Sequence, residues 1–178
     1  KYLIYVLFIF FLNKSAHCEI INKIKINGNE RISNATIEMF SGISINDKID
    51  SNQLNEILKN LYNSNYFKNV SLDFQNNILY INVVENPVIQ SISYDGIDSK
   101  RIREILLKDL KLKSRSSYNE SLLKKDKQQI EASLKNLGYY FSKIDIYKED
   151  LDDNKLNIKL NIDLGEKAKI NKITFLGD

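Results

Sequence analysis

The fold follows from the stretch INKIKING at residues 21–28, whose pattern Ile-x-x-Ile-x-x-x-Gly returns twice further along the chain. The second copy runs from Ile89 to Gly96, and the third runs from Ile170 to Gly177. In each copy apolar side chains alternate before the glycine, which predicts a β-strand that ends in a turn. The recurrence predicts an array of small modules that each begin with this strand.

The segment between the first two copies predicts two helices and a β-hairpin. A short helix over residues 34–40 ends at Gly42, which adopts the left-handed conformation readily. After a loop over residues 43–49, Asp50 or Ser51 caps a second helix. The hairpin turns at Asn76-Asn77. Apolar spacing assigns these side chains to the core: Leu54, Ile57, Leu58, Leu61 and Tyr62 in the second helix, and Val70, Leu72, Phe74, Leu79, Ile81 and Val83 in the hairpin.

The segment after the second copy repeats this order. Residues 58–61 (LKNL) recur at residues 134–137, and a Tyr-Phe pair follows both copies. This identity indicates a duplication. The elements expected in the second module are a strand over 89–95, helices over 99–108 and 120–137, strands over 140–148 and 156–164, and a turn at 152–154.

The single proline, Pro87, marks the boundary between the modules, because proline cannot donate to a sheet ladder. Gly165 marks a second boundary. We expect one domain over residues 19–86, a second over 87–166 and the start of a third over 167–178. Each complete module is expected to be α+β in the order β-α-α-β-β, with two helices on one face of a three-stranded mixed sheet.

The first 18 residues read as a secretory signal peptide. Lys1 precedes 11 apolar residues, Tyr2 to Leu12, and a polar stretch follows. A membrane-spanning helix needs about 20 apolar residues, so the run is short for an anchor. We expect cleavage after Cys18. The alternatives are an uncleaved anchor and a lipoprotein, but bulky His17 stands where a lipoprotein signal needs a small residue.

Cleavage removes most of the side chains that catalysis and metal binding commonly use. His17 and Cys18 are the only His and Cys in the chain. We therefore expect no cofactor, no metal site and no enzymatic activity. An enzyme that uses carboxylates, or Ser114 or Ser117 with Lys113, is an alternative of another class. The expected mature chain has 24 Lys and Arg against 23 Asp and Glu, which argues against nucleic-acid binding.

The chain resembles the POTRA domains of the BamA family of outer-membrane protein assembly factors over residues 20–178. The residues that carry this resemblance are IKINGNER at 24–31, LYNSNYFKNV at 61–70 and VVENP at 83–87, with LGYYF at 137–141 and Gly-Glu at 165–166 in the second module.

The resemblance implies a periplasmic region of an outer-membrane protein. In that family a signal peptide leads into several POTRA domains, and a membrane barrel follows the last. The implied partners are unfolded outer-membrane proteins and accessory lipoproteins, with the membrane reached through a barrel beyond this chain. The rival hypotheses are a two-partner secretion transporter and an anchored cell-division protein, although division proteins usually carry one POTRA domain.

The binding sites that we expect are exposed edges of the sheets. An unpaired edge strand can add an extended polypeptide by β-augmentation. If the third strand of each module is central, the second strand lies at an edge. Its charges would equally serve to protect the edge from aggregation. The expected binding residues are Asn69, Val70, Ser71, Leu72, Asp73, Ile144, Asp145, Ile146 and Tyr147, and Pro87 and Gly165 are the expected hinge residues between modules.

Overall fold

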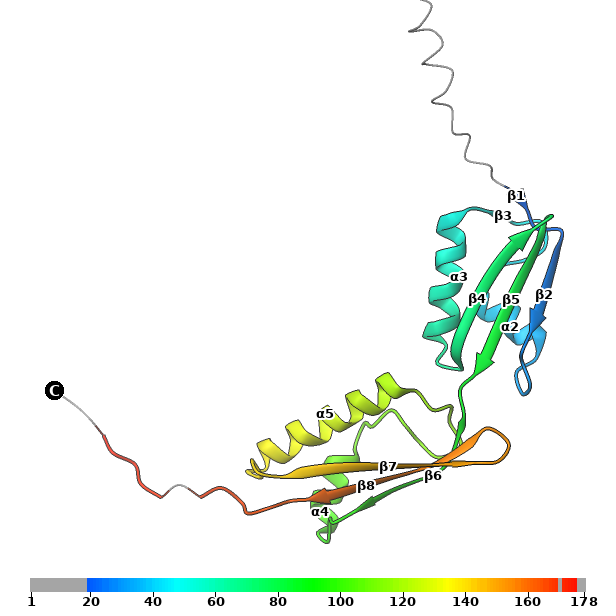
Figure 1. The fold of residues 1–178 in the computed structure, drawn as a ribbon. Coiled ribbons are helices and arrows are strands. Elements are labelled where there is room, and N and C mark those ends of the chain that lie inside the picture. The colour runs from blue at the N-terminus through cyan, green and yellow to red at the C-terminus, as the bar shows by residue number, and fades with distance from the viewer. Residues whose placement is uncertain (1–18, 170, 176–178) are drawn as a thin grey trace, which may run out of the picture. The chain divides into compact units, whose positions relative to one another are not determined.

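The computed structural model describes residues 19–169 and 171–175. The chain forms two compact units that divide between Glu85 and Asn86 (Figure 1). The expected signal peptide, residues 1–18, lies outside the described residues. In the part of the chain that is described, no helix has the length and apolar character needed to cross a bilayer.

The first unit contains a three-stranded mixed sheet with two helices on one face. Its sheet has the order β2-β5-β4, in which β2 runs parallel and β4 antiparallel to the central β5. Two short strands, β1 and β3, pair separately. The elements are β1 (Glu19–Ile20), β2 (Lys23–Asn27), α2 (Asn34–Ser41), β3 (Lys48–Ile49), α3 (Ser51–Asn63), β4 (Phe67–Gln75) and β5 (Ile78–Glu85).

The second unit has the same topology, with the sheet order β6-β8-β7. Strand β6 is parallel to the central β8, and β7 is antiparallel to it. The elements are β6 (Val88–Asp95), α4 (Lys100–Leu107), α5 (Glu120–Asn136), β7 (Lys143–Leu151) and β8 (Lys155–Asp163). The predicted order β-α-α-β-β is therefore confirmed, with β1 and β3 as additions in the first unit.

The helix ends form where the sequence predicts them. Ser33 and Asp50 are the N-caps of α2 and α3, and their side chains accept backbone N–H groups of the first helical turn. Gly42 ends α2 with a φ of 70°, and its N–H donates to the carbonyl of Glu38. Local residue chemistry thus fixes the boundaries of these helices.

In the first two copies of the strand pattern, close backbone contact requires the glycine at the end. At Gly28, with a φ of +82°, a Cβ atom would lie 2.1 Å from the carbonyl oxygen of Val83. At Gly96, with a φ of +83°, it would lie 2.0 Å from the carbonyl oxygen of Ile162. No side chain fits at such distances. The two contacts also make Val83 and Ile162 equivalent positions in the two units.

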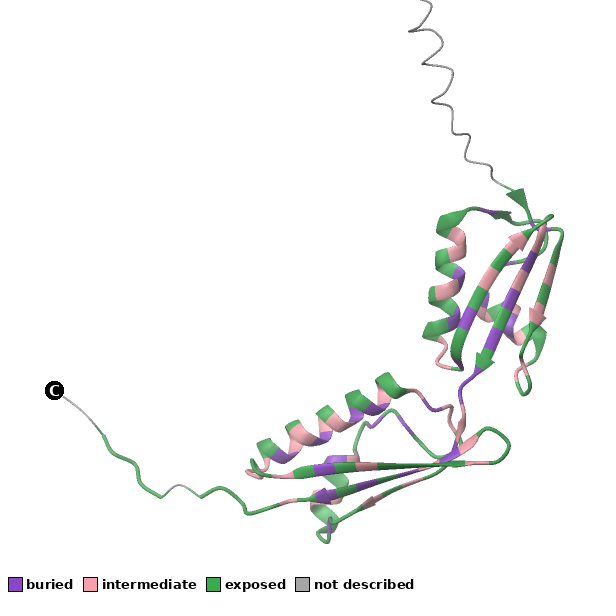
Figure 2. Cartoon of the chain, in the orientation of Figure 1, coloured by how far each residue is buried: buried purple, intermediate pink, exposed green. Residues whose placement is uncertain are grey.

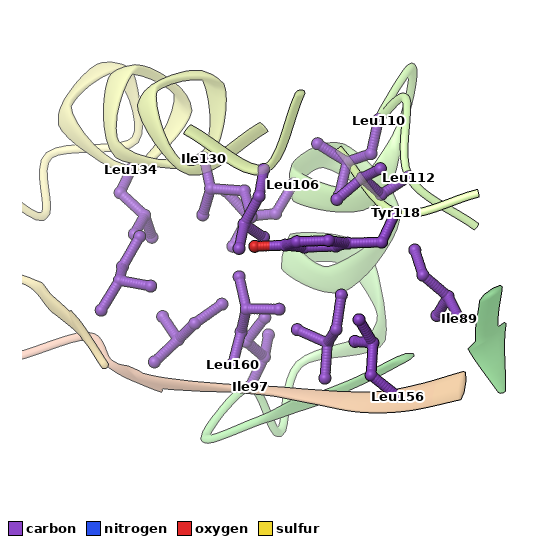
Figure 3. Packing of buried hydrophobic residues seen from close by; sticks show 14 residues of the cluster. Ile89, Ile97, Leu106, Leu110, Leu112, Tyr118, Ile130, Leu134, Leu156 and Leu160 are labelled. Atoms are coloured by element: carbon purple, nitrogen blue, oxygen red, sulfur yellow. The ribbon is translucent and has the colours of Figure 1, made fainter. Parts of the chain in front are cut away.

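Each unit has its own apolar core between its helices and one face of its sheet (Figure 2). In the second unit the ring of Tyr118 lies among the apolar side chains of the core (Figure 3). The fully buried side chains include Ile21, Ile37, Leu61, Leu79 and Ile81 in the first unit, and Ile89, Leu106, Ile130, Leu134 and Leu160 in the second.

Three local predictions differ from the structure. Strand β3 lies inside the predicted loop, because residues 48–49 pair with β1. Strand β7 begins at Lys143 instead of residue 140, and Tyr140 and Phe141 lie in an exposed turn before it. Residues 171–175, in the third copy of the strand pattern, have no regular structure. Ile170 and Gly177 of that copy lie outside the described residues.

Candidate functional site: the edges of the two sheets

The residues expected to bind polypeptide lie on edge strands. Residues 69–73 belong to β4 and residues 144–147 belong to β7, and both strands pair with a central strand on one side. The third strand of each unit, β5 or β8, is central as predicted. Among the described residues, β4 and β7 have no second strand as a neighbour.

The opposite edges are covered where the first strands begin. In the first unit, Ile21 donates its N–H to the carbonyl of Asp47 at 2.9 Å and accepts from the N–H of Asn46 at 2.7 Å. In the second unit, Ile89 makes the same pair of bonds with Ser116 and Arg115, at 2.9 and 2.7 Å. These loops bond to Ile21, two residues before β2 begins, and to Ile89 within β6, whereas no loop backbone bonds to β4 or β7 in this way among the described residues. Strands β4 and β7 are therefore the better candidates for strand addition.

Side chains on β4 alternate between the core and solvent. Val70 is buried, and the next two inward residues, Leu72 and Phe74, are partly buried against the core. The outward residues Ser71 and Asp73 pair across the sheet with Asn82 and Tyr80. A strand with the same alternation would extend both the apolar and the polar face.

One residue outside the prediction lies at this edge. The hydroxyl of Tyr62, on the last turn of α3, accepts a hydrogen bond from the N–H of Val70 at 3.1 Å. It lies 3.3 Å from Oδ1 of Asn69 and 3.5 Å from the carbonyl oxygen of Val70, both of which can accept its proton. The backbone of Val70 is thus engaged by a side chain of the same unit.

A cluster of charged and polar side chains includes Lys148, which lies near the middle of β7. The Nζ atom of Lys148 lies 3.0 Å from Oε2 of Glu120 and 3.3 Å from the hydroxyl of Tyr118. The hydroxyl of Tyr118 in turn donates to Glu120. An inward-pointing charge on an edge strand discourages further strand pairing. The cluster therefore separates Ile144–Tyr147, the expected binding segment, from the rest of β7.

The cluster favours the charged forms of its lysine and carboxylate. Hydrogen bonds from Tyr118 and then Lys148 lower the pKa of Glu120. Hydrogen bonds to Glu120 and then Tyr118 raise the pKa of Lys148. Burial, followed by the hydrogen bond to Glu120, raises the pKa of the Tyr118 hydroxyl. A lysine held in its protonated form is a poor nucleophile, so the cluster serves structure better than catalysis.

Two buried carboxylates hold loops beside the sheets, and neither was predicted. Glu85 accepts hydrogen bonds from three successive backbone N–H groups, those of Glu30, Arg31 and Ile32. Asp126 accepts the N–H groups of Lys111 and Leu112 at 2.9 and 2.8 Å. No sequence motif could have identified these two carboxylates, because their hydrogen-bond partners are backbone N–H groups of loops elsewhere in the chain.

Of the residues considered for catalysis, Lys113 and Ser117 take part in backbone contacts. The Oγ of Ser116 donates to the carbonyl of Lys113 at 2.7 Å, which closes a turn. Ser117 forms a β-bridge with Val88. In the described part of the chain, no group of three or more His, Cys, Asp or Glu side chains could hold a metal ion.

The two expected hinge residues have different local environments. The carbonyl of Pro87 accepts the N–H of Tyr118 at 2.8 Å, which holds the proline to the second unit. Gly165 has a φ of +62°, and its N–H donates to Oδ1 of Asp163 at 3.0 Å. A glycine tolerates this left-handed conformation at little cost.

Comparison with known proteins links both units to one family. The family described as "POTRA: Surface antigen variable number repeat" matches residues 19–86 and residues 87–166. The outer membrane protein assembly factor BamA of Neorickettsia risticii (strain Illinois) is 24% identical over 180 residues, which cover 94% of this chain and 23% of that protein. BamA of Buchnera aphidicola is 25% identical over 184 residues, 97% of this chain and 29% of that protein. The chain thus spans roughly a quarter of the length of these curated relatives.

Solved structures show the same fold at low sequence identity. The N-terminal domain of Omp85 from Thermosynechococcus elongatus superposes with a TM-score of 0.55 at 13% identity, over 82% of this chain and 63% of that one. The POTRA3-5 structure of BamA from Haemophilus influenzae gives a TM-score of 0.53 at 18% identity, over 88% of this chain and 70% of that one. At these identities the likeness concerns the fold.

Proposed function

Since this chain belongs to the POTRA family, we propose that it is the periplasmic region of an outer-membrane β-barrel protein assembly factor and binds unfolded outer-membrane proteins by β-augmentation. The relatives that support this proposal are named outer membrane protein assembly factors. Their names describe assembly and not an enzymatic reaction.

The observation that carries the proposal is the position of β4 and β7. Each is an antiparallel edge strand whose far side faces no other strand among the described residues. Backbone N–H and C=O groups on such an edge can pair with any extended chain, whatever its side chains. This chemistry suits a protein that handles many different clients.

The alternation of side chains favours one class of client. On β7, Ile144 is buried and Ile146 packs against the core, whereas Asp145 and Tyr147 are exposed. A strand of a membrane barrel also alternates between apolar and polar residues, over about ten positions. If such a strand paired with β7, its apolar residues would join the sheet face that packs against the helices. Its polar residues would join the face that is exposed to water.

The remaining elements of the proposal concern the rest of the assembly. We infer that the signal peptide is cleaved after Cys18, that the mature chain lies in the periplasm, and that a barrel in the outer membrane follows. Accessory lipoproteins would be further partners. Pro87 and Gly165 would permit limited bending between modules. Sequencing of the mature N-terminus separates this proposal from the anchored division protein: the proposal expects Glu19, and retention of residues 2–12 would contradict cleavage.

Hydrogen exchange tests the binding. The chain starting at Glu19 keeps all the helices and strands that the structure describes in the two units. With a peptide of about ten alternating polar and apolar residues, we expect slower amide exchange along β4, which holds the expected residues 69–73, and in residues 144–147 of β7. A matched peptide, N-methylated at every residue, keeps the side chains but has no backbone N–H to donate on either side and should protect neither segment. Equal protection by both peptides, or unchanged exchange with the first, would rule out edge pairing.

A further inference from the structure

We propose that Tyr62 closes the start of the β4 edge to strand addition, so that a polypeptide strand pairs with residues 72–75 in the first unit but with all of residues 144–147 in the second. This inference rests on the proposed function. The β4 edge then has fewer residues available for pairing than the β7 edge. Tyr62 sets the point on β4 at which a bound strand must end.

The hydrogen bonds of Val70 define the side of the strand that Tyr62 occupies. On an antiparallel strand, the N–H and C=O groups of one residue point to the same side. The hydroxyl of Tyr62 lies 3.1 Å from the N atom of Val70 and 3.5 Å from its carbonyl oxygen. Tyr62 belongs to α3 and not to β5, so these groups point toward the outer edge. A hydroxyl is both a donor and an acceptor, so it replaces one residue of a neighbouring strand.

The same contact excludes another backbone. A paired strand lies about 4.8 Å from its neighbour. A hydroxyl at hydrogen-bond distance from Val70, with the phenol ring behind it, fills that space. The helix holds the ring in place because Leu61, the preceding residue, is fully buried. In Figure 1, α3 runs alongside β4, with its last turn near the start of the strand.

The part of β4 that can still pair with another strand begins two residues after Val70. Because a strand repeats every two residues, Leu72 and Phe74 present their backbone groups to the same side as Val70. Residues 72–75 therefore offer a short pairing segment next to the closed position.

In the repeated sequence, the second unit has a glycine at the position where the first has Tyr62. Both Tyr62 and Gly138 directly follow the repeated Leu-Lys-Asn-Leu sequence. Val70 pairs with Val83, and Ile144 pairs with Ile162, which is the equivalent of Val83, so Ile144 corresponds to Val70. Gly138 has no side chain and cannot supply a hydroxyl to Ile144. Among the described residues, no side chain is hydrogen-bonded to the backbone of Ile144 and no second strand lies beside β7, so this edge can pair from its first apolar residue.

The variant Tyr62→Phe tests the inference, because it keeps the ring and removes the hydroxyl. In the peptide-free chain from Glu19 onward, we expect the Val70 amide to exchange about 2- to 10-fold faster than in the wild type, the factor for one lost hydrogen bond. With the alternating peptide, protection should extend to Val70 in the second variant, Tyr62→Ala, which removes the ring as well as the hydroxyl; Tyr62 is 42% exposed, so its removal leaves the buried core intact. Tyr66→Phe is the matched control: Tyr66 stacks on Phe40 with 5.4 Å between ring centroids, and this stack does not need the hydroxyl.

The possible outcomes separate this inference from the proposed function. Unchanged Val70 exchange in Tyr62→Phe, or a peptide footprint that ends at the same residue in Tyr62→Ala and in the wild type, would overturn the closing role of Tyr62. If the peptide protected no edge in either protein, the binding function would fail. Faster Val70 exchange in the free variant would then still support Tyr62 as the residue that occupies the edge.

Discussion

Glu85 and Arg31 form an ion pair in which Oε2 of the glutamate lies 3.0 Å from Nε of the arginine. The Glu85 side chain is 2% exposed and stands at the end of β5, the central strand of the first unit. Its other oxygen accepts three backbone N–H groups from residues 30–32. One buried carboxylate thus holds the loop between β2 and α2 against the sheet.

Replacement of Glu85 by glutamine should destabilise the first unit. The amide removes the charge and presents an NH₂ group to donors, so at least one buried hydrogen bond is lost. We expect a loss of about 1–3 kcal/mol in the free energy of unfolding. NMR signal intensities in urea report each unit separately. The control is Glu56→Gln, an exposed position on α3. A loss no larger than that of the control, or one confined to the second unit, would contradict the role of Glu85.

The same carboxylate makes the first unit sensitive to acid. Burial raises the pKa of Glu85, but the backbone N–H groups and Arg31 lower it more, so the folded pKa lies below the ordinary value. An unfolded glutamate has a pKa of about 4.3. The stabilisation is therefore complete above that pH and is lost as the pH falls through the folded pKa. Urea midpoints should fall more steeply between about pH 5 and about pH 3 in the wild type than in Glu85→Gln. Parallel pH profiles would show that Glu85 contributes nothing.

Replacing Gly28 or Gly96 by alanine should lower the free energy of unfolding more than replacing another glycine that has positive φ. Gly28→Ala and Gly96→Ala combine positive φ with a contact to backbone oxygen at 2.1 or 2.0 Å. We expect losses above about 2 kcal/mol in the unit concerned. Gly42 is the control, because its φ is +70° but a Cβ there would meet only Asn60 Nδ2 at 3.5 Å. Thermal unfolding of the three variants compares them. Equal losses at Gly28 and Gly42 would mean that φ alone matters.

Asp126 should stabilise the second unit as Glu85 stabilises the first. It is 2% exposed and accepts two backbone N–H groups from the loop before α5. In Asp126→Asn, one of these groups loses its acceptor, and we expect a loss of about 1–3 kcal/mol. Asp152→Asn, in the exposed turn after β7, is the control. Urea unfolding followed by NMR should show the loss in residues 88–163 alone. An unchanged urea midpoint would show that Asp126 does not stabilise the second unit.

Local residue chemistry predicted most of the secondary structure. The cap at Asp50 and the turn at Asn76-Asn77 form as the sequence indicates. In these cases the deciding contacts lie within a few residues of each other. The central position of the third strand was only the simplest arrangement, in which it pairs with its hairpin partner and with the first strand, and the structure confirms it in both units.

The sequence was less informative about side chains whose burial and contacts depend on residues far away in the chain. Tyr62 follows the apolar spacing of α3, so its pattern indicates a core residue, but it is 42% exposed and reaches the edge of β4. Asp126 lies among Lys124, Lys125 and Lys127 and reads as part of a solvated helix face. It is buried because the loop at residues 111–112 folds over it.

Identical sequence does not guarantee identical burial. In the repeated Leu-Lys-Asn-Leu segment, the fourth residue is fully buried in the first unit, as Leu61, but only partly buried in the second, as Leu137. Helix α5 ends just before Leu137, whereas α3 continues to Asn63. The position of the helix end therefore changes which leucine fills the core.

Binding of an extended strand along β7 is tested most directly by intermolecular nuclear Overhauser effects between the alternating peptide and the labelled chain. Edge pairing predicts contacts between peptide backbone protons and the backbone protons of Ile144 and Ile146, in the alternating arrangement of a β-ladder. The contacts should be absent from Ile92 and Tyr94 on the opposite edge. Contacts confined to side chains of the helices, or to β6, would contradict the account.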